Sequence, residues 1–196
     1  INVYRSALER SDYKVPTLSN LGDTYLDMGE WERARQTFER ALALAPGNAV
    51  LHHHMGQVER GAGQRQKAIA ALRRAVQLDP THTRAYVELG EVLTEQNQLD
   101  GAAHRFEQAL ALEPSYSRAW FGLAQSRDRA GQGKEALKAY RAFLELWPHA
   151  DARQAPPLVG KLVAVHLKGS AVRPRHTQRG PGREVPLRDR RRDGSR

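Results

Sequence analysis

Apolar positions recur along this chain of 196 residues with a period of 34 residues. One column of large apolar residues, each followed at once by a small residue, reads Leu21 and Gly22, Met55 and Gly56, Leu89 and Gly90, and Leu123 and Ala124. Two later columns read Ala34, Ala68, Ala102 and Ala136, then Phe38, Leu72, Phe106 and Tyr140. A sequence period of this size is typical of a solenoid, in which each copy packs mainly on its neighbours.

Each copy is long enough for two helices. Within each half, the apolar columns recur at steps of three and four residues, which is one face of an α-helix. The residues between the halves, Gly29, Gly63, Asn97 and Gly131, tolerate the left-handed conformation that closes a helix. The residues after the second half are prolines, which cannot continue a helix: Pro46, Pro80, Pro114 and Pro148. The sequence therefore predicts an all-α solenoid of antiparallel helix pairs.

The small columns predict how the two helices of a pair touch. Glycine or alanine in the first helix and alanine in the second let the two backbones approach closely. The large side chain four residues after that alanine, such as Phe106 after Ala102, fills the space beside the contact. A large residue at the alanine is expected to force the pair apart.

These columns resemble the tetratricopeptide repeat, and the resemblance covers residues 15 to 148. The units expected from it are residues 15–48, 49–82, 83–116 and 117–150. The resemblance implies a right-handed superhelix whose first helices line a concave groove, and it implies protein binding in that groove.

The chain outside these units has a different character. Residues 1–14 fit the second helix of a truncated preceding repeat, and because the chain starts at Ile1 we expect its natural N-terminus to be missing. Residues 151–167 contain a short apolar stretch after Pro156 and Pro157, which we interpret as a candidate capping segment for the end of the solenoid. Residues 168–196 are rich in Arg, Gly and Pro, and we expect a disordered basic tail there.

Charge argues against nucleic acid as a partner. The net charge is +9, but residues from 151 onward hold 12 Lys and Arg against 4 Asp and Glu, or +8. That leaves 19 against 18, or +1, for residues 1–150, so the predicted folded part lacks a basic footprint. No apolar run is long enough to span a membrane. The chain has no cysteine, so the localisation stays undetermined between cytoplasm and periplasm, and 25 Arg against 6 Lys indicates the codon bias of a bacterial genome.

No residue set indicates catalysis, a metal or a cofactor. The run His52, His53 and His54 attracts attention, but consecutive helical side chains point about 100° apart and do not converge on one ion. Asp23 and Asp27 share a helix face, where we expect them to meet a ligand peptide or water rather than a substrate. We therefore expect no enzymatic activity, no cofactor and no metal site.

The groove implied by the resemblance is the candidate binding site. Arg84 and Arg118 hold equivalent positions of adjacent units, and we expect both to receive a carboxylate, while Val87 and Phe121 offer apolar contacts. The full set of candidate groove residues is Asp23, Asp27, His53, Gln57, Arg60, Arg84, Val87, Glu91, Glu95, Arg118, Phe121, Gln125 and Arg129.

The sequence thus predicts a protein-interaction scaffold that holds a partner peptide or helix in its groove, as a fragment of a larger bacterial protein. Two alternatives remain. In the first, the array is the docking region of an enzyme of the glycosyltransferase or sulfotransferase type whose catalytic domain lies outside this chain. In the second, it is an envelope or pilus assembly factor. The partner and the oligomeric state are not specified by the sequence.

Overall fold

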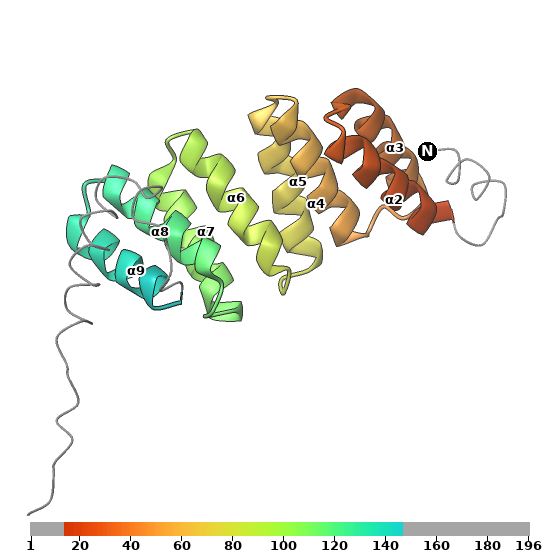
Figure 1. Ribbon diagram of the computed structural model, residues 1–196. Coiled ribbons are helices and arrows are strands. Elements are labelled where there is room, and N and C mark those ends of the chain that lie inside the picture. Colours follow the sequence, from red (N-terminus) through yellow and green to blue (C-terminus); the bar gives the residue numbers. More distant parts are fainter. Residues whose placement is uncertain (1–13, 147–196) are drawn as a thin grey trace, which may run out of the picture.

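The computed structural model describes residues 14–146, and over this range every regular element is an α-helix. The helices stack in pairs along one direction, in the order of the sequence (Figure 1). Their bounds are α2 (Lys14–Asp27), α3 (Trp31–Leu44), α4 (Ala49–Gly61), α5 (Arg65–Leu78), α6 (Thr83–Glu95), α7 (Leu99–Leu112), α8 (Ser117–Arg129) and α9 (Gly133–Leu146). The predicted all-α solenoid of helix pairs is confirmed.

The turns within the pairs form as the sequence predicts. All four turn residues have positive φ: 71° at Gly29, 75° at Gly63, 60° at Asn97 and 76° at Gly131. The amide of the next residue then reaches back to a carbonyl of the first helix, as Gln98 does to Leu93 at 2.9 Å. This bond satisfies a helix carbonyl that would otherwise lack a partner, and the chain reverses within three residues in each pair.

Proline ends the second helix of the first three pairs, as predicted. Helix α3 stops two residues before Pro46, and α5 and α7 stop two residues before Pro80 and Pro114. The fourth proline, Pro148, lies outside the described residues.

Small residues let the helices of a pair touch. A Cβ added to Gly22 would lie 2.6 Å from the Phe38 ring, and one added to Gly90 would lie 2.9 Å from the Phe106 ring. These distances are shorter than any real Cβ contact, so each ring rests directly on the backbone of the facing helix. Ala102, on the other side of this contact, has no exposed surface.

The apolar core is divided into two clusters. The first joins α2, α3 and α4 through residues such as Leu18, Phe38 and Leu51. The second runs from α5 to α9. The division falls between α4 and α5, because the buried apolar residues of α4 belong to the first cluster and those of α5 to the second.

Three expectations fall outside the described residues: the truncated repeat over residues 1–14 apart from Lys14, the capping segment 151–167 and the basic tail 168–196. They stay predictions. Within residues 14–146, no helix is long and apolar enough to cross a membrane.

Replacing Ala102 by Arg is expected to lower the free energy of unfolding by about 3 to 5 kcal/mol, because the side chain overpacks the helix contact and buries an unpaired charge. Thermal and urea denaturation measure the change. Ala111 lies on the same helix but is exposed, so Ala111→Arg is the matched control and should leave stability nearly unchanged. Equal melting temperatures for the parent and Ala102→Arg would contradict the packing described here.

Candidate functional site

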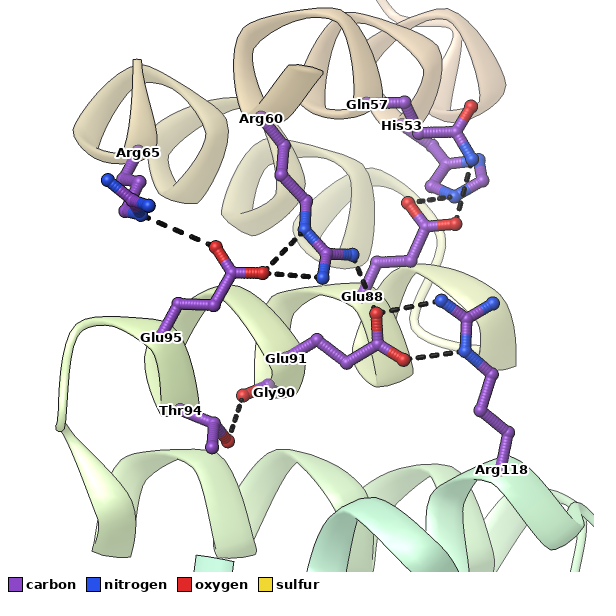
Figure 2. Close-up of polar contacts among 10 residues, drawn as sticks. All are labelled: His53, Gln57, Arg60, Arg65, Glu88, Gly90, Glu91, Thr94, Glu95 and Arg118. Atoms are coloured by element: carbon purple, nitrogen blue, oxygen red, sulfur yellow. Dashed lines mark hydrogen bonds and ion pairs between the residues drawn. The ribbon is translucent and has the colours of Figure 1, made fainter. Parts of the chain in front are cut away.

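The first helices of the second, third and fourth pairs, α4, α6 and α8, carry a continuous network of charged side chains. Helix α6 presents Glu88, Glu91 and Glu95 in a row, and the side chains that meet them come from α4 and α8 and, at Arg65, from the start of α5 (Figure 2). We call this surface the charged face. Its residues lie three, four or seven apart on each helix, which places them on one side.

Glu91 joins all three helices. Its carboxylate accepts hydrogen bonds from Arg60 Nη1 of α4 at 2.6 Å and from Arg118 of α8, whose Nε and Nη2 lie 2.5 and 2.7 Å away. The bond to Glu91 raises the pKa of Arg118. Burial would lower the pKa of Arg60, but its bonds to Glu91 and Glu95 outweigh that and leave it raised. The two guanidinium groups are thus held as cations around one carboxylate.

Glu88 forms a more deeply buried contact with α4. Gln57 donates a hydrogen bond to it at 2.7 Å, and His53 Nε2 lies 3.0 Å from its other oxygen. Glu88 is only 8% exposed and His53 only 5%. Burial alone would raise the pKa of Glu88, but the contacts with His53 and Gln57 outweigh it and keep its pKa below the ordinary value.

Two pockets open on this side of the described chain. The first, of about 460 Å³, lies between α6 and α8, and its wall includes the rings of Phe106 and Phe121 and the backbone at Gly122. Charged and polar groups at this pocket are Arg60, Glu91, Thr94, Glu95, Arg118, Gln125 and Arg129. We call it the α6–α8 pocket. It combines an apolar surface with a polar border, as ligand sites do.

The second pocket, of about 570 Å³, lies at the beginnings of α4 and α6, and we call it the histidine pocket. Its lining is Val50, His53, His54, Asp79, Thr81, His82, Thr83, Arg84, Glu113 and Tyr116. Among residues 14–146, the structure contains no group of three or more His, Cys, Asp or Glu that could hold a metal ion.

The two arginines that were expected to receive a carboxylate differ. Arg84 is exposed and makes no hydrogen bond or ion pair within the described part of the chain. Arg118 is already paired with Glu91. Arg129, also in the candidate set, donates to the Thr94 carbonyl at 2.9 Å and to Asn97 Oδ1 at 3.2 Å, so its contacts are with neutral groups.

Two candidate groove residues, Val87 and His53, are buried in this structure, whereas the expected groove would expose them. Val87 is 1% exposed and belongs to the second core cluster. His53 contacts the rings of His54 and His82 as well as Glu88. Both hold the fifth position of their unit, and the neighbouring unit packs close enough to cover them. Phe121, at the same position of the next unit, is partly buried, and its ring packs against Tyr140 and Phe143.

Asp23 and Asp27 do not form a pair of carboxylates directed at one point. Asp23 Oδ1 lies 3.0 Å from His54 Nδ1, and burial raises the pKa of this aspartate, although the nearby histidine opposes the effect. Asp27 is exposed. The remaining candidates, Gln57, Glu95 and Gln125, lie on the charged face or in the α6–α8 pocket.

Sequence reasoning missed several residues of this region. Glu88 was not a candidate, although it is the most buried carboxylate of the charged face. The pair Arg35 and Glu59 was missed too; their side chains meet at 2.8 Å between α3 and α4. A signal was present: acidic residues 88, 91 and 95 follow polar or basic residues 53, 57 and 60 at separations of 31 to 35 residues, close to one repeat.

Comparison with protein families supports the same conclusion as the fold. Three models described as tetratricopeptide repeat match residues 14–81, 59–105 and 93–151, which together span residues 14–151. The chain belongs to the tetratricopeptide repeat family. Proteins of this family typically act as protein-binding scaffolds.

Solved structures of tetratricopeptide repeat proteins are similar to this chain. A crystal structure of MamA is 28% identical, covers 73% of this chain and 84% of its own, and superposes with a TM-score of 0.68. MamA from Desulfovibrio magneticus RS-1 is 21% identical, with coverages of 82% and 94% and a TM-score of 0.70. YrrB, described as a tetratricopeptide repeat protein with an unusual peptide-binding site, is 23% identical, with coverages of 85% and 80% and a TM-score of 0.65. No curated protein sequence matches the chain significantly.

Replacing Glu91 by Gln is expected to lower the free energy of unfolding by about 1 kcal/mol, because two guanidinium groups lose a shared and partly buried carboxylate. The loss should shrink in about 1 M NaCl, where the parent pairs are screened. Urea denaturation at two salt concentrations measures both effects.

Glu39→Gln is the matched control, since Glu39 is exposed on α3 and makes no ion pair among the described residues. An equal change in both variants would show that Glu91 does not connect the three helices energetically.

Proposed function

We propose that this chain is a scaffold that binds an acidic peptide segment of a partner protein along α4, α6 and α8, with one apolar side chain of the peptide in the α6–α8 pocket. The support is one arginine without a carboxylate partner on a surface where two other arginines are paired with glutamates. Arg60 and Arg118 are neutralised by Glu91 and Glu95, whereas Arg84 is exposed and has no partner in the described chain.

The observation that carries the proposal is the state of Arg84. A carboxylate of a bound peptide can accept two hydrogen bonds from the Arg84 guanidinium, and no carboxylate of the described chain has to be displaced first. Arg129 offers a second positive charge at the α6–α8 pocket, because its present contacts are to a carbonyl and an amide oxygen. Together these two groups favour a peptide that carries at least two acidic residues.

The α6–α8 pocket supports the apolar part of the proposal. Phe106 is nearly fully buried, and Phe121 is held by ring contacts with Tyr140 and Phe143 at 6.2 and 5.2 Å between centroids. A rigid aromatic wall costs little conformational entropy on binding, which favours an apolar anchor at this point. Gln125 is available beside it for a hydrogen bond to a peptide backbone.

No residue of the charged face favours either alternative role. These roles are docking within an enzyme of the glycosyltransferase or sulfotransferase type, and assembly of an envelope or pilus. Both concern surroundings that the described residues do not include. The proposal of a peptide-binding scaffold is compatible with either.

A library of random peptides displayed on phage, selected on the full chain, tests this function. We expect selected peptides to be enriched in Asp and Glu around one aromatic or branched apolar residue. Titration of a selected peptide by fluorescence anisotropy should show binding that weakens by about tenfold or more in Arg84→Glu, because attraction is replaced by repulsion.

Arg74→Glu is the matched control, because the substitution changes the net charge by the same amount. Arg74 is exposed on α5 and lines neither pocket. If selected peptides are not acidic, or if both variants weaken binding equally, the site is not the one proposed.

A further inference from the structure

The α6–α8 pocket lies at a junction where the sixth position of the repeat has no side chain. In the four units, this position reads Asn20, His54, Glu88 and Gly122. The His54 ring lies against the Phe38 ring, with 5.3 Å between the centroids. A Cβ added to Gly122, by contrast, would come within 2.4 Å of the Phe106 ring. The Phe106 ring therefore rests on the backbone of α8, without a sixth-position side chain beside it.

Phe106 supplies a deep part of the pocket wall. A Cβ added to Gly90 of α6 would lie 2.9 Å from its ring, so the backbones of α6 and α8 enclose the ring from two sides. The side chain is only 1% exposed, and the ring lines the α6–α8 pocket. The equivalent residues of the preceding units, Phe38 and Leu72, line neither this pocket nor the histidine pocket. The absence of a side chain at Gly122 thus goes together with an aromatic surface inside a pocket.

Phe121 of α8 is the second aromatic wall of this pocket. Its ring packs at an angle against the rings of Tyr140 and Phe143, so contacts within the chain fix its orientation. Neither this ring nor the enclosed Phe106 ring has to be ordered when a ligand binds, which lowers the entropy cost of binding. Aromatic rings attract one another in tilted and offset arrangements beyond the effect of buried area. Two fixed rings therefore favour a third ring over an aliphatic side chain of similar size.

Two arginines at the border of the pocket are bound through the edges of their guanidinium groups. Arg118 donates from Nε and Nη2 to Glu91, and Arg129 donates from Nη1 and Nη2 to the Thr94 carbonyl and to Asn97. The N–H donors lie in the plane of the guanidinium, so these hydrogen bonds leave its flat faces available for stacking. A guanidinium face is attracted to the face of an aromatic ring, whereas an aliphatic side chain gains no such contact.

We propose that the α6–α8 pocket is a site for one aromatic side chain of the bound partner, and that Gly122 is the residue that determines this specificity. The inference rests on the proposed function and narrows its apolar anchor to Phe, Tyr or Trp. The equivalent position holds His54 at the junction of α2 with α4 and Glu88 at the junction of α4 with α6. The aromatic residue therefore binds between α6 and α8, and it sets the register of the peptide along the first helices.

Neutral amino-acid derivatives test the aromatic site without an acidic peptide. N-acetyl-phenylalaninamide and N-acetyl-leucinamide are titrated separately into the isotope-labelled full chain, and the amide signals are followed by two-dimensional NMR. We expect the aromatic probe, at roughly millimolar concentration, to shift the amide signals of Thr94, Gly122 and Gln125, which line the pocket. It should bind about three- to tenfold more tightly than the aliphatic probe, because ring contacts add to the effect of buried area.

Gly122→Ala should weaken binding of the aromatic probe by about fivefold or more, because the added methyl group displaces the Phe106 ring. Gly133→Ala is the matched control, since it adds the same group at the start of α9, where a Cβ meets nothing within 4 Å. Circular dichroism and thermal melting compare the folds of the variants. Phe121→Leu keeps an apolar side chain but removes one ring, so it should abolish the preference for the aromatic probe even if Gly122→Ala folds poorly.

Several outcomes would overturn the aromatic site. These are equal binding of the two probes to the parent, absence of shifts at the pocket amides, equal binding in a folded Gly122→Ala and in Gly133→Ala, and an unchanged preference in Phe121→Leu. Both probes are neutral, and Arg84 does not line this pocket, so Arg84→Glu should leave probe binding unchanged. Failure of the acidic-peptide proposal would therefore not alter this result, and the two failures can be told apart.

Discussion

The structure depends on one contact, in which a large side chain of the second helix of a pair rests on the bare backbone of the first helix. Phe38 on Gly22, Leu72 on Gly56 and Phe106 on Gly90 all show it. The contact brings two backbones close together and excludes any side chain between them, so the geometry of a pair leaves little freedom. Because every pair has nearly the same geometry, copies stack in line and present their first helices on a common side.

The contacts between pairs depend on a different position, the sixth of each unit, which holds Asn20, His54, Glu88 and Gly122 in turn. Gly122 lets α8 approach the Phe106 ring, and the junction is tight and apolar. His54 instead places its own ring against Phe38, with 5.3 Å between the centroids. Glu88 brings a charge into the junction and must be compensated from α4. This column therefore decides whether the contact between successive first helices is apolar or polar, while the second helix of each pair packs on the next pair, as α5 does on α6 in one apolar cluster.

Most charged side chains of the charged face pair with one another within the chain, so they stabilise the fold. A carboxylate shared by two guanidinium groups, as at Glu91, fixes long side chains that would otherwise lose conformational entropy on binding a partner. Under the proposed function, the groups left for a partner are the unpaired Arg84, Arg129 with its neutral contacts, and the aromatic wall of the α6–α8 pocket. Specificity would then arise from the few groups that have no charged partner within the described chain.

By itself, the sequence determined the helices, their turns and their pairing. The signals that fix these features act locally, so their effect can be predicted from neighbours in the chain. They are residues that adopt a left-handed backbone conformation, such as Gly29 and Asn97, prolines such as Pro46, and the apolar periodicity. Only the tertiary structure decided which groove residues are accessible. Val87 and Phe121 hold the same position of the repeat, yet the first is buried and the second lines a pocket; Arg84 and Arg118 also match, yet only the second has a carboxylate partner. The physical reason is that exposure and ion pairing depend on the side chains of the adjacent unit, about 34 residues away, and on how closely its backbone approaches.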